Sequence, residues 1–188
     1  MTRSDRQLLS DDGSDAFEEF VVRHHDDVHR YVLRRLGPNE ADAVVNDVFL
    51  TAYRTRSRFR ADAEDARPWL LGIATNLIRR ERRAEARALR QFAASAIDPV
   101  APHIRSPEVA ISADLAAAMH GMRPKHRDAL FLFAVAELTV DEIAEAMEVA
   151  PGTVKSWLHR ARAHARRVLG AHEVNDAAPP TATTETPS

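Results

Sequence analysis

The stretch from Leu138 to Leu169 limits what this chain can fold into more than any other segment. Its pattern predicts two short helices joined by a tight turn. Thr139 followed by Glu142 makes a capping-box pattern at the start of the first helix. Pro151 stands where the second helix begins, a position that tolerates the missing N–H group. Two helices connected in this way, with a basic second helix, form a helix-turn-helix.

Charge in this stretch is segregated between the two predicted helices. Residues 151–170 contain five basic and no acidic side chains, whereas residues 137–150 contain five acidic and no basic ones. A basic helix of this kind suits contact with nucleic-acid phosphates. The alternative is a solvated helical hairpin whose charges only keep it soluble. The pattern favours DNA binding over that alternative.

Composition points to helices throughout and excludes several kinds of site. Only 6 of the 188 residues are glycine, and 45% are hydrophobic. Ala, Leu, Arg and Glu dominate, so we expect an all-α fold. The absence of cysteine excludes disulfides, thiol catalysis and cysteine-ligated zinc. No apolar run approaches the roughly 18 residues that span a bilayer, and the N-terminus lacks the apolar core of a signal peptide. We therefore expect a cytoplasmic protein without membrane insertion.

The pattern divides the chain into two helical domains with flexible flanks. Residues 14–90 are predicted to form the first domain, and residues 106–170 the second, a four-helix domain that ends in the helix-turn-helix. Residues 91–105, which contain Pro99 and Pro102 and show no clear hydrophobic period, are predicted to form a flexible linker. Residues 1–13 and the acidic tail 171–188 are predicted to be disordered.

Three helices are expected in the first domain, over about 14–36, 39–55 and 66–90. The third has an apolar first half and an arginine-rich second half. The loop 56–65, which precedes it, carries three arginines around Phe59. The expected N-caps of these helices are Ser14 or Asp15, Asn39 and Asp65.

Three sequence signatures occur in a fixed order. They are ADAVVNDVFLTAYR (41–54), ARPWLLGIATNLIRRERR (66–83) and the pair MRPKHRDALFLFAVAELTVDEIAEAM with APGTVKSWLHRARAHARRVL (122–147 and 150–169). Together they resemble bacterial sigma factors of the extracytoplasmic-function (ECF) group in the sigma-70 family. The resemblance implies a region 2 domain at 14–90 and a region 4 domain at 106–170. It implies a partner of core RNA polymerase and promoter DNA that catalyses nothing and needs no cofactor.

Polymerase binding is assigned by the resemblance to the second helix. In the family, this helix meets a basic coiled coil of the polymerase's large subunit, and acidic side chains suit that partner. The family usually has an acid where Ala43 stands and Gln-Glu where this chain has Asn-Asp, so the side chains here reach less far. The implied contact residues are Asp42, Asn46, Asp47 and Leu50.

Reading of the promoter's minus-10 element is assigned by the resemblance to the loop 56–65 and the third helix. Unpaired DNA requires a pocket, stacking surfaces and a cationic track. Trp69 lies on the apolar stripe and is interpreted as core rather than as a base platform. The implied residues are Arg58, Phe59, Arg60, Asn76, Arg79, Arg80 and Arg83.

Reading of the minus-35 element is assigned by the resemblance to the helix 151–169, whose first turns would meet base edges. Lys155 and Arg160 are the candidate donors to guanine. Trp157 replaces a common arginine of the family and either packs sideways or contacts a thymine methyl group. Glu148 replaces a glycine, so we expect a left-handed turn strained by about 1 kcal/mol. The implied residues are Thr153, Lys155, Ser156, Trp157, His159 and Arg160.

Two other classes of protein were weighed against this interpretation. A metal enzyme is suggested only by the cluster of His24, His25, His29, Asp26 and Asp27, and nothing elsewhere completes a three-ligand catalytic site. We therefore expect no metal. A helix-turn-helix repressor or response-regulator output module would explain 138–169 but leave the signatures within 41–83 without a role.

Two mechanisms of control are compatible with the sequence. The resemblance implies an anti-sigma factor that wedges between the two domains, and a flexible linker would permit it. Alternatively, the acidic tail 171–188 shields the basic helices within the same chain.

Overall fold

The structure, a computed structural model, describes residues 3–60, 63, 65–95, 119 and 121–176. No strand occurs in these ranges, and the all-α prediction is confirmed. None of the described helices is long and apolar enough to span a membrane. The elements are α1 (Asp5–Ser10), α2 (Ser14–Leu36), α3 (Pro38–Thr55), the 3₁₀ turn η1 (Arg56–Arg58), α4 (Arg67–Ser95), α6 (Pro124–Ala134), α7 (Val140–Ala146) and α8 (Pro151–Asp176).

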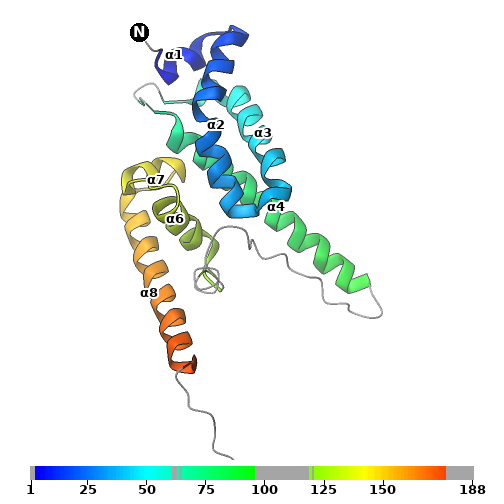
Figure 1. The fold of residues 1–188 in the computed structure, drawn as a ribbon, viewed down its shortest axis with the longest axis vertical. Coiled ribbons are helices and arrows are strands. Elements are labelled where there is room, and N and C mark those ends of the chain that lie inside the picture. The colour runs from blue at the N-terminus through cyan, green and yellow to red at the C-terminus, as the bar shows by residue number, and fades with distance from the viewer. Residues whose placement is uncertain (1–2, 61–62, 64, 96–118, 120, 177–188) are drawn as a thin grey trace, which may run out of the picture.

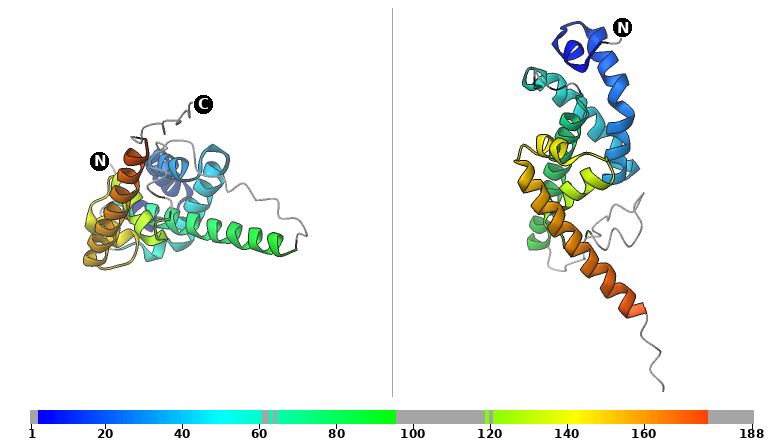
Figure 2. Two further views of the ribbon diagram at one scale, coloured as in Figure 1. Left: turned by 90° about the horizontal axis from the view of Figure 1, so that it is seen from below. Right: turned by 90° about the vertical axis from the view of Figure 1, so that its left-hand side faces the viewer.

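The helices form two packed groups that contact each other. Helices α2, α3 and α4 lie side by side, and α1 covers one end of α2 (Figure 1). Helix α7 lies against α4, and α6 and α8 pack on α7 and on each other. The C-terminal parts of α4 and α8 project away from the packed helices (Figure 2).

The junction of α2 and α3 depends on Gly37. Its φ of 83° is left-handed, which glycine adopts without steric cost, and it is both the C-cap of α2 and the N-cap of α3. Pro38 follows at the first position of α3, so the predicted cap at Asn39 is wrong. Helix α2 has the expected bounds, but its N-cap is Gly13, so the predicted cap at Ser14 or Asp15 is wrong.

The expected cap of α4 is present. The side chain of Asp65 accepts a hydrogen bond from the backbone N–H of Arg67 at 2.8 Å. This bond satisfies one of the amide groups that the first turn of a helix leaves without a partner.

Helix α1 contradicts the prediction that residues 1–13 are disordered. Ser4 and Gln7 form a reciprocal capping box at its start, and the side chains of Leu8 and Leu9 are buried. A box of two hydrogen bonds and two leucine anchors is enough to hold this six-residue helix on the larger helices behind it.

A buried carboxylate, that of Asp5, ties α1 to two distant segments. Its Oδ1 accepts a hydrogen bond from Nη1 of Arg23 at 2.7 Å. Its Oδ2 lies 2.8 Å from Nε2 of His24 and 2.8 Å from the backbone N of Ala66. Burial raises the pKa of Asp5, but these hydrogen bonds and the charge of His24 lower it to about 2. One side chain therefore joins α1, α2 and the residue that precedes α4.

Two helices, α4 and α8, end later in the sequence than predicted. Helix α4 continues to Ser95, and α8 continues to Asp176, so residues 91–95 are not linker and residues 171–176 are not disordered tail. Neither extension contains proline or an interior glycine that would end a helix, so each helix continues beyond its predicted end. The rest of the predicted linker, the first part of the predicted domain at 106–170 and the tail 177–188 lie outside the described residues.

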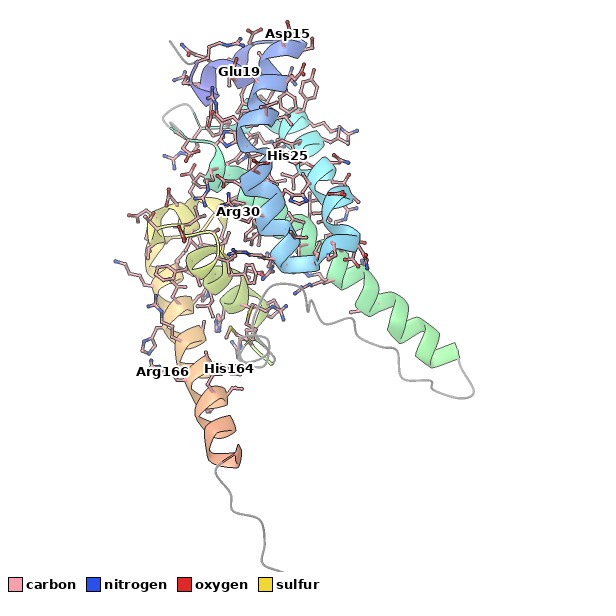
Figure 3. All side chains as sticks on the ribbon, viewed as in Figure 1. Asp15, Glu19, His25, Arg30, His164 and Arg166 are labelled. Atoms are coloured by element: carbon pink, nitrogen blue, oxygen red, sulfur yellow. The ribbon has the colours of Figure 1, made fainter. Side chains whose placement is uncertain are left out.

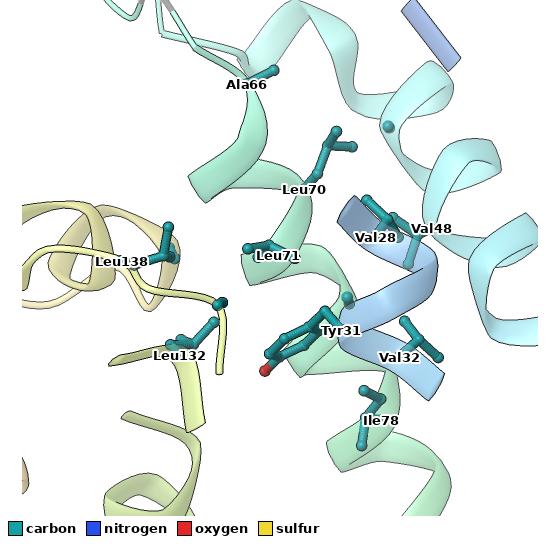
Figure 4. Packing of buried hydrophobic residues seen from close by; sticks show 14 of the residues in the cluster. Val28, Tyr31, Val32, Val48, Ala66, Leu70, Leu71, Ile78, Leu132 and Leu138 are labelled. Carbon is teal, nitrogen blue, oxygen red and sulfur yellow. The ribbon is translucent and has the colours of Figure 1, made fainter. Parts of the chain in front are cut away.

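The hydrophobic core runs without a break from the first helical group into the second. Tyr31 of α2 and Leu71 of α4 face Leu132 of α6 and Leu138, which precedes α7 (Figure 4). Each of the buried aliphatic side chains stabilises the fold by about 1.5–3 kcal/mol. The two predicted domains therefore share one core in this conformation.

Asp5→Asn is expected to lower the free energy of unfolding by about 2 kcal/mol at pH 7. The folded pKa of Asp5 lies at about 2, below its ordinary 3.8, so its contribution is present above about pH 4 and is lost as the pH falls toward 2. Urea unfolding at pH 7 and at pH 3 would measure this. Equal losses at both pH values would contradict the assigned role, and Asp11→Asn, at an exposed position, is the control.

Candidate nucleic-acid interface

The predicted helix-turn-helix is present as α7 and α8. Oγ1 of Thr139 accepts a hydrogen bond from the N–H of Glu142 at 3.3 Å, and Oε2 of Glu142 accepts one from the N–H of Thr139 at 2.7 Å. The hydroxyl of Thr139 also donates a hydrogen bond to Oε2 of Glu142 at 2.7 Å, and this bond, together with the one from the Thr139 N–H, lowers the pKa of the Glu142 carboxyl. The capping box predicted from the sequence is confirmed. It fixes the start of α7, on which α8 packs.

The turn between the two helices has the left-handed residue that was expected. Glu148 has a φ of 53°. Its N–H donates to the carbonyl of Glu145 at 3.1 Å, and the N–H of Val149 donates to the carbonyl of Ala144 at 2.9 Å. These hydrogen bonds hold the strained residue in place, so the motif keeps its shape without the glycine.

Helix α8 has one buried face and one exposed cationic face. Val154, Leu158 and Ala161 are buried against α6 and α7. Of the six residues predicted to read minus-35, Lys155, His159 and Arg160 are exposed, and Thr153, Ser156 and Trp157 are half-buried.

Trp157 packs sideways, which was one of its two predicted alternatives. The ammonium of Lys125 on α6 lies 5.5 Å from the centre of the Trp157 ring. Further along α8 the exposed cations continue, with Arg162, Arg166 and Arg167 beyond the first three turns. Figure 3 shows His164 and Arg166 on the part of α8 that leads away from the packed body. The cationic surface therefore extends past the turns that would enter a DNA groove.

The loop predicted to bind the minus-10 element is held by its own side chains. The rings of Phe59 and Trp69 lie 5.4 Å apart, and both pack against the core, as expected for Trp69. Arg56 donates hydrogen bonds to the carbonyl of Tyr53 at 2.9 Å and to Asp12 at 3.0 Å. Arg58 and Arg60 are exposed beside this framework.

Helix α4 presents most, but not all, of its predicted minus-10 residues to solvent. Asn76, Arg80 and Arg83 are exposed and follow one another at helical spacing. Arg79 is different, because its Nε and Nη2 lie 3.2 and 3.0 Å from Oδ2 of Asp128 on α6. The structure thus places Arg79 in a contact within the protein.

All four predicted polymerase-binding residues are exposed on α3. Leu50 is 46% exposed, and Tyr53, one turn further on, is 43% exposed. The ring of Tyr53 lies 4.3 Å from the guanidinium of Arg56. Nε2 of His29 lies 3.3 Å from Oδ1 of Asp42. Leu50 and Tyr53 therefore form an apolar patch next to the acidic side chains of Asp42 and Asp47. The four residues are Asp42, Asn46, Asp47 and Leu50.

The histidine cluster is divided between two environments. His24 is buried and bound to Asp5, whereas the rings of His25 and His29 stack at 5.7 Å on the other side of α2. Among the described residues, ligand atoms of Asp5, His24 and Asp65 lie within 4.8 Å of one another. Both oxygens of Asp5 already accept hydrogen bonds, so this group holds α1 in position.

Sequence reasoning missed the residues that join the two helical groups. Arg35 and Asp128 are each 2% exposed and form a buried ion pair. The sequence does indicate that Arg35 is buried, because Arg35 follows Val28 and Tyr31 at helical spacing and so lies on the apolar stripe of α2. Asp128 is the only acid in α6.

Comparison with known proteins agrees with this arrangement. The family model Sigma-70 region 2 matches residues 20–88, and Sigma-70, region 4 matches residues 112–164. The chain is 32% identical over 173 residues to the ECF RNA polymerase sigma factor SigM of Mycobacterium tuberculosis, which covers 89% of this chain and 86% of SigM. This chain belongs to the ECF group of the sigma-70 family.

Other relatives and solved structures resemble this sigma factor over most of its length. It is 28% identical to the RNA polymerase sigma factor CarQ of Myxococcus xanthus, over 89% of this chain and 97% of CarQ. Its fold resembles CnrH in complex with the cytosolic domain of CnrY, with a TM-score of 0.62, 23% identity and coverage of 90% and 99%. It also resembles RpoE in complex with the anti-sigma factor NepR from Bartonella quintana, with a TM-score of 0.60, 20% identity and coverage of 82% and 96%.

Glu148→Gly is expected to raise the free energy of unfolding by about 1 kcal/mol, because glycine adopts a positive φ without strain. Urea unfolding of the variant would measure it. Glu145→Gly is the matched control, since the same change inside α7 should lower stability by about 1 kcal/mol. A loss at both positions would show that the turn is not strained.

Proposed function

We propose that this sigma factor binds core RNA polymerase through α3 and reads two promoter elements with separate helical surfaces. Helix α8 reads minus-35 in the major groove. The loop after η1 and helix α4 read minus-10 after the duplex opens. The exposed cationic face of α8, on a helix fixed by the capped α7, is the observation that carries this proposal.

The minus-35 contacts are argued from the chemistry of α8. Lys155 and Arg160 are exposed in the first three turns, where a recognition helix meets base edges. Both can donate to O6 and N7 of guanine, and His159 lies between them on the same surface. The later arginines suit phosphate contacts, which position the helix without reading sequence.

The minus-10 contacts are argued from the loop and from α4. Arg58 and Arg60 flank the anchored Phe59, and Asn76, Arg80 and Arg83 continue the exposed polar track along α4. A cationic track next to an aromatic ring is the arrangement that binds unpaired strands. Phe59 is half-buried against Trp69, so it supports the loop and offers only part of its ring to a base.

Polymerase binding is argued from the mixed surface of α3. Asp42, Asp47 and Asn46 surround the exposed Leu50, and such a surface suits a basic partner with an apolar anchor point. A repressor or response-regulator module would have no use for this second surface. The match of residues 20–88 to region 2 disfavours that alternative.

An anti-sigma factor is the proposed inhibitory partner. Two of the solved structures with this fold, CnrH with CnrY and RpoE with NepR, are complexes, and NepR is named an anti-sigma factor. This chain would bind such a protein across its two helical groups.

Run-off transcription with core polymerase and fragmented genomic DNA tests the function and supplies the promoter. On that promoter, Lys155→Ala and Arg160→Ala are each expected to reduce specific transcripts roughly 5- to 100-fold, which corresponds to about 1–3 kcal/mol per base contact. Arg34→Ala removes an exposed arginine from α2 and controls for the loss of one positive charge outside the proposed DNA-binding surfaces. Tight, sequence-specific duplex binding by the free protein would instead support a repressor.

Asp47→Lys is expected to weaken binding to core polymerase about tenfold or more, because it reverses one charge on the α3 surface. Gel filtration of the sigma factor with core would measure co-elution. Glu18→Lys makes the same reversal at an exposed position of α2 and should retain binding. Equal binding by both variants would place the polymerase contact elsewhere.

A further inference from the structure

Helix α8 has an aromatic residue, Trp157, at the border of its exposed face. Successive residues of a helix are about 100° apart, so Trp157 lies about 60° from Val154 on one side and about 60° from Arg160 on the other. Val154 is fully buried and Arg160 is exposed, which agrees with the half-buried position of Trp157. The ring therefore lies where the packed face of α8 meets the surface proposed to enter the DNA groove.

The first turn of α6 reaches this border. Helix α6 packs on α8, and the ammonium of Lys125 lies 5.5 Å from the centre of the Trp157 ring. This distance is within the roughly 6 Å over which a cation is attracted to the face of an indole ring. Lys125 is exposed, and the described residues place no carboxylate in an ion pair with it. Its positive charge is therefore held beside α8 and is not neutralised within the described part of the protein.

A buried histidine, His126, reports two further cations next to this lysine. Burial lowers the pKa of His126, and the positive charges of Arg160 on α8 and Arg123 at the N-cap of α6 lower the pKa further. Arg123 and Arg160 are both exposed. The two helices thus bring the side chains of Arg123, Lys125 and Arg160 to one region of the surface.

The start of α6 contributes positive charge without acidic side chains. Residues 123–127 have the sequence RPKHR, with three basic and no acidic residues. The next residue, Asp128, is buried and is bound to Arg35 and Arg79. The first turn of α6 therefore extends the cationic face of α8 onto a second helix.

DNA phosphate is the ligand that this extension fits. When α8 lies in the major groove, a cation beside its reading face meets the sugar-phosphate backbone rather than base edges. An ammonium is a compact point charge that binds a phosphate oxygen without a fixed orientation. A free lysine side chain loses conformational entropy when it is held at one phosphate. Contact with the Trp157 ring restricts Lys125 before DNA binds, and so lowers that cost.

We propose that the minus-35 interface extends onto α6, where Lys125 binds a phosphate of the DNA backbone and Trp157 is the positioning residue that holds this lysine. The inference rests on the proposed function, because it assumes that α8 lies in the groove of the minus-35 element. It also accounts for tryptophan at a position where the family commonly has arginine. The cation that α8 lacks at this position is supplied by α6.

Lys125→Ala tests the phosphate contact in holoenzyme bound to a fluorescent fragment of the promoter. Promoter affinity is expected to fall about 3- to 10-fold, and the slope of log affinity against log salt concentration should decrease by about 1. The loss should be equal on a promoter with a scrambled minus-35 element, because phosphates carry no sequence information. Arg34→Ala, which removes an exposed arginine from α2, is the control and should leave the salt slope unchanged.

A double-mutant cycle tests the positioning role of Trp157. Trp157→Leu keeps an apolar side chain but removes the ring, so it should reduce the salt slope as Lys125→Ala does. In the Lys125→Ala background, Trp157→Leu should cause no further reduction. Trp157→Phe retains an aromatic face and should retain most of the slope. Thermal unfolding of each variant reports loss of packing separately, because a purely structural role would lower stability without changing the salt slope.

The remaining outcomes each contradict one step. An unchanged salt slope in Lys125→Ala would overturn the phosphate contact, and a loss confined to the intact minus-35 element would show that Lys125 reads bases instead. Additive losses from Lys125→Ala and Trp157→Leu would overturn the positioning role. If Lys155→Ala and Arg160→Ala also leave promoter binding unchanged, the proposed function of α8 fails, and this inference fails with it. If these two variants weaken binding and Lys125→Ala does not, only the extension onto α6 fails.

Discussion

The carboxylate of Asp128 is the interaction on which the arrangement of the two helical groups depends. It is almost fully buried and is shared by Arg35 and Arg79, which come from different helices of the other group. Removal of one partner from such a pair leaves an uncompensated buried charge and costs about 3–5 kcal/mol. The cluster therefore fixes how α6 lies against α2 and α4.

Helix α4 packs on α7 and also carries the surface proposed to bind minus-10 DNA. Its Gly72 edge packs on α7, while its arginines point toward the surface proposed to bind an unpaired strand. Only Arg79 belongs to both sets. The surface of α3 that is proposed to bind core polymerase is exposed in the same structure.

Local signals predicted most of the helices, and long-range contacts account for what was missed. The Gly37-Pro38 junction, the Thr139 capping box and the left-handed Glu148 each depend on a few neighbouring residues. By contrast, Asp5 is hydrogen-bonded to His24, which lies 19 residues away in the sequence, and Arg35 is hydrogen-bonded to Asp128, which lies 93 residues away. No short-range pattern reports such partners. The exposed site residues on α3, α4 and α8 were predicted from the family signatures. The pairing of Arg79 with Asp128 could be found only from the three-dimensional arrangement.

The docking of α1 has a consequence for how this protein is produced and labelled. The carboxylate of Asp5 reaches the residue that precedes α4, and Asp12 holds Arg56 in the turn before the minus-10 loop. Residues 4–12 therefore pack behind a loop that lies some fifty positions later in the chain. An affinity tag or fusion partner joined directly before Ser4 would lie next to this packed segment and could displace it. A tag placed after the end of α8 leaves it untouched.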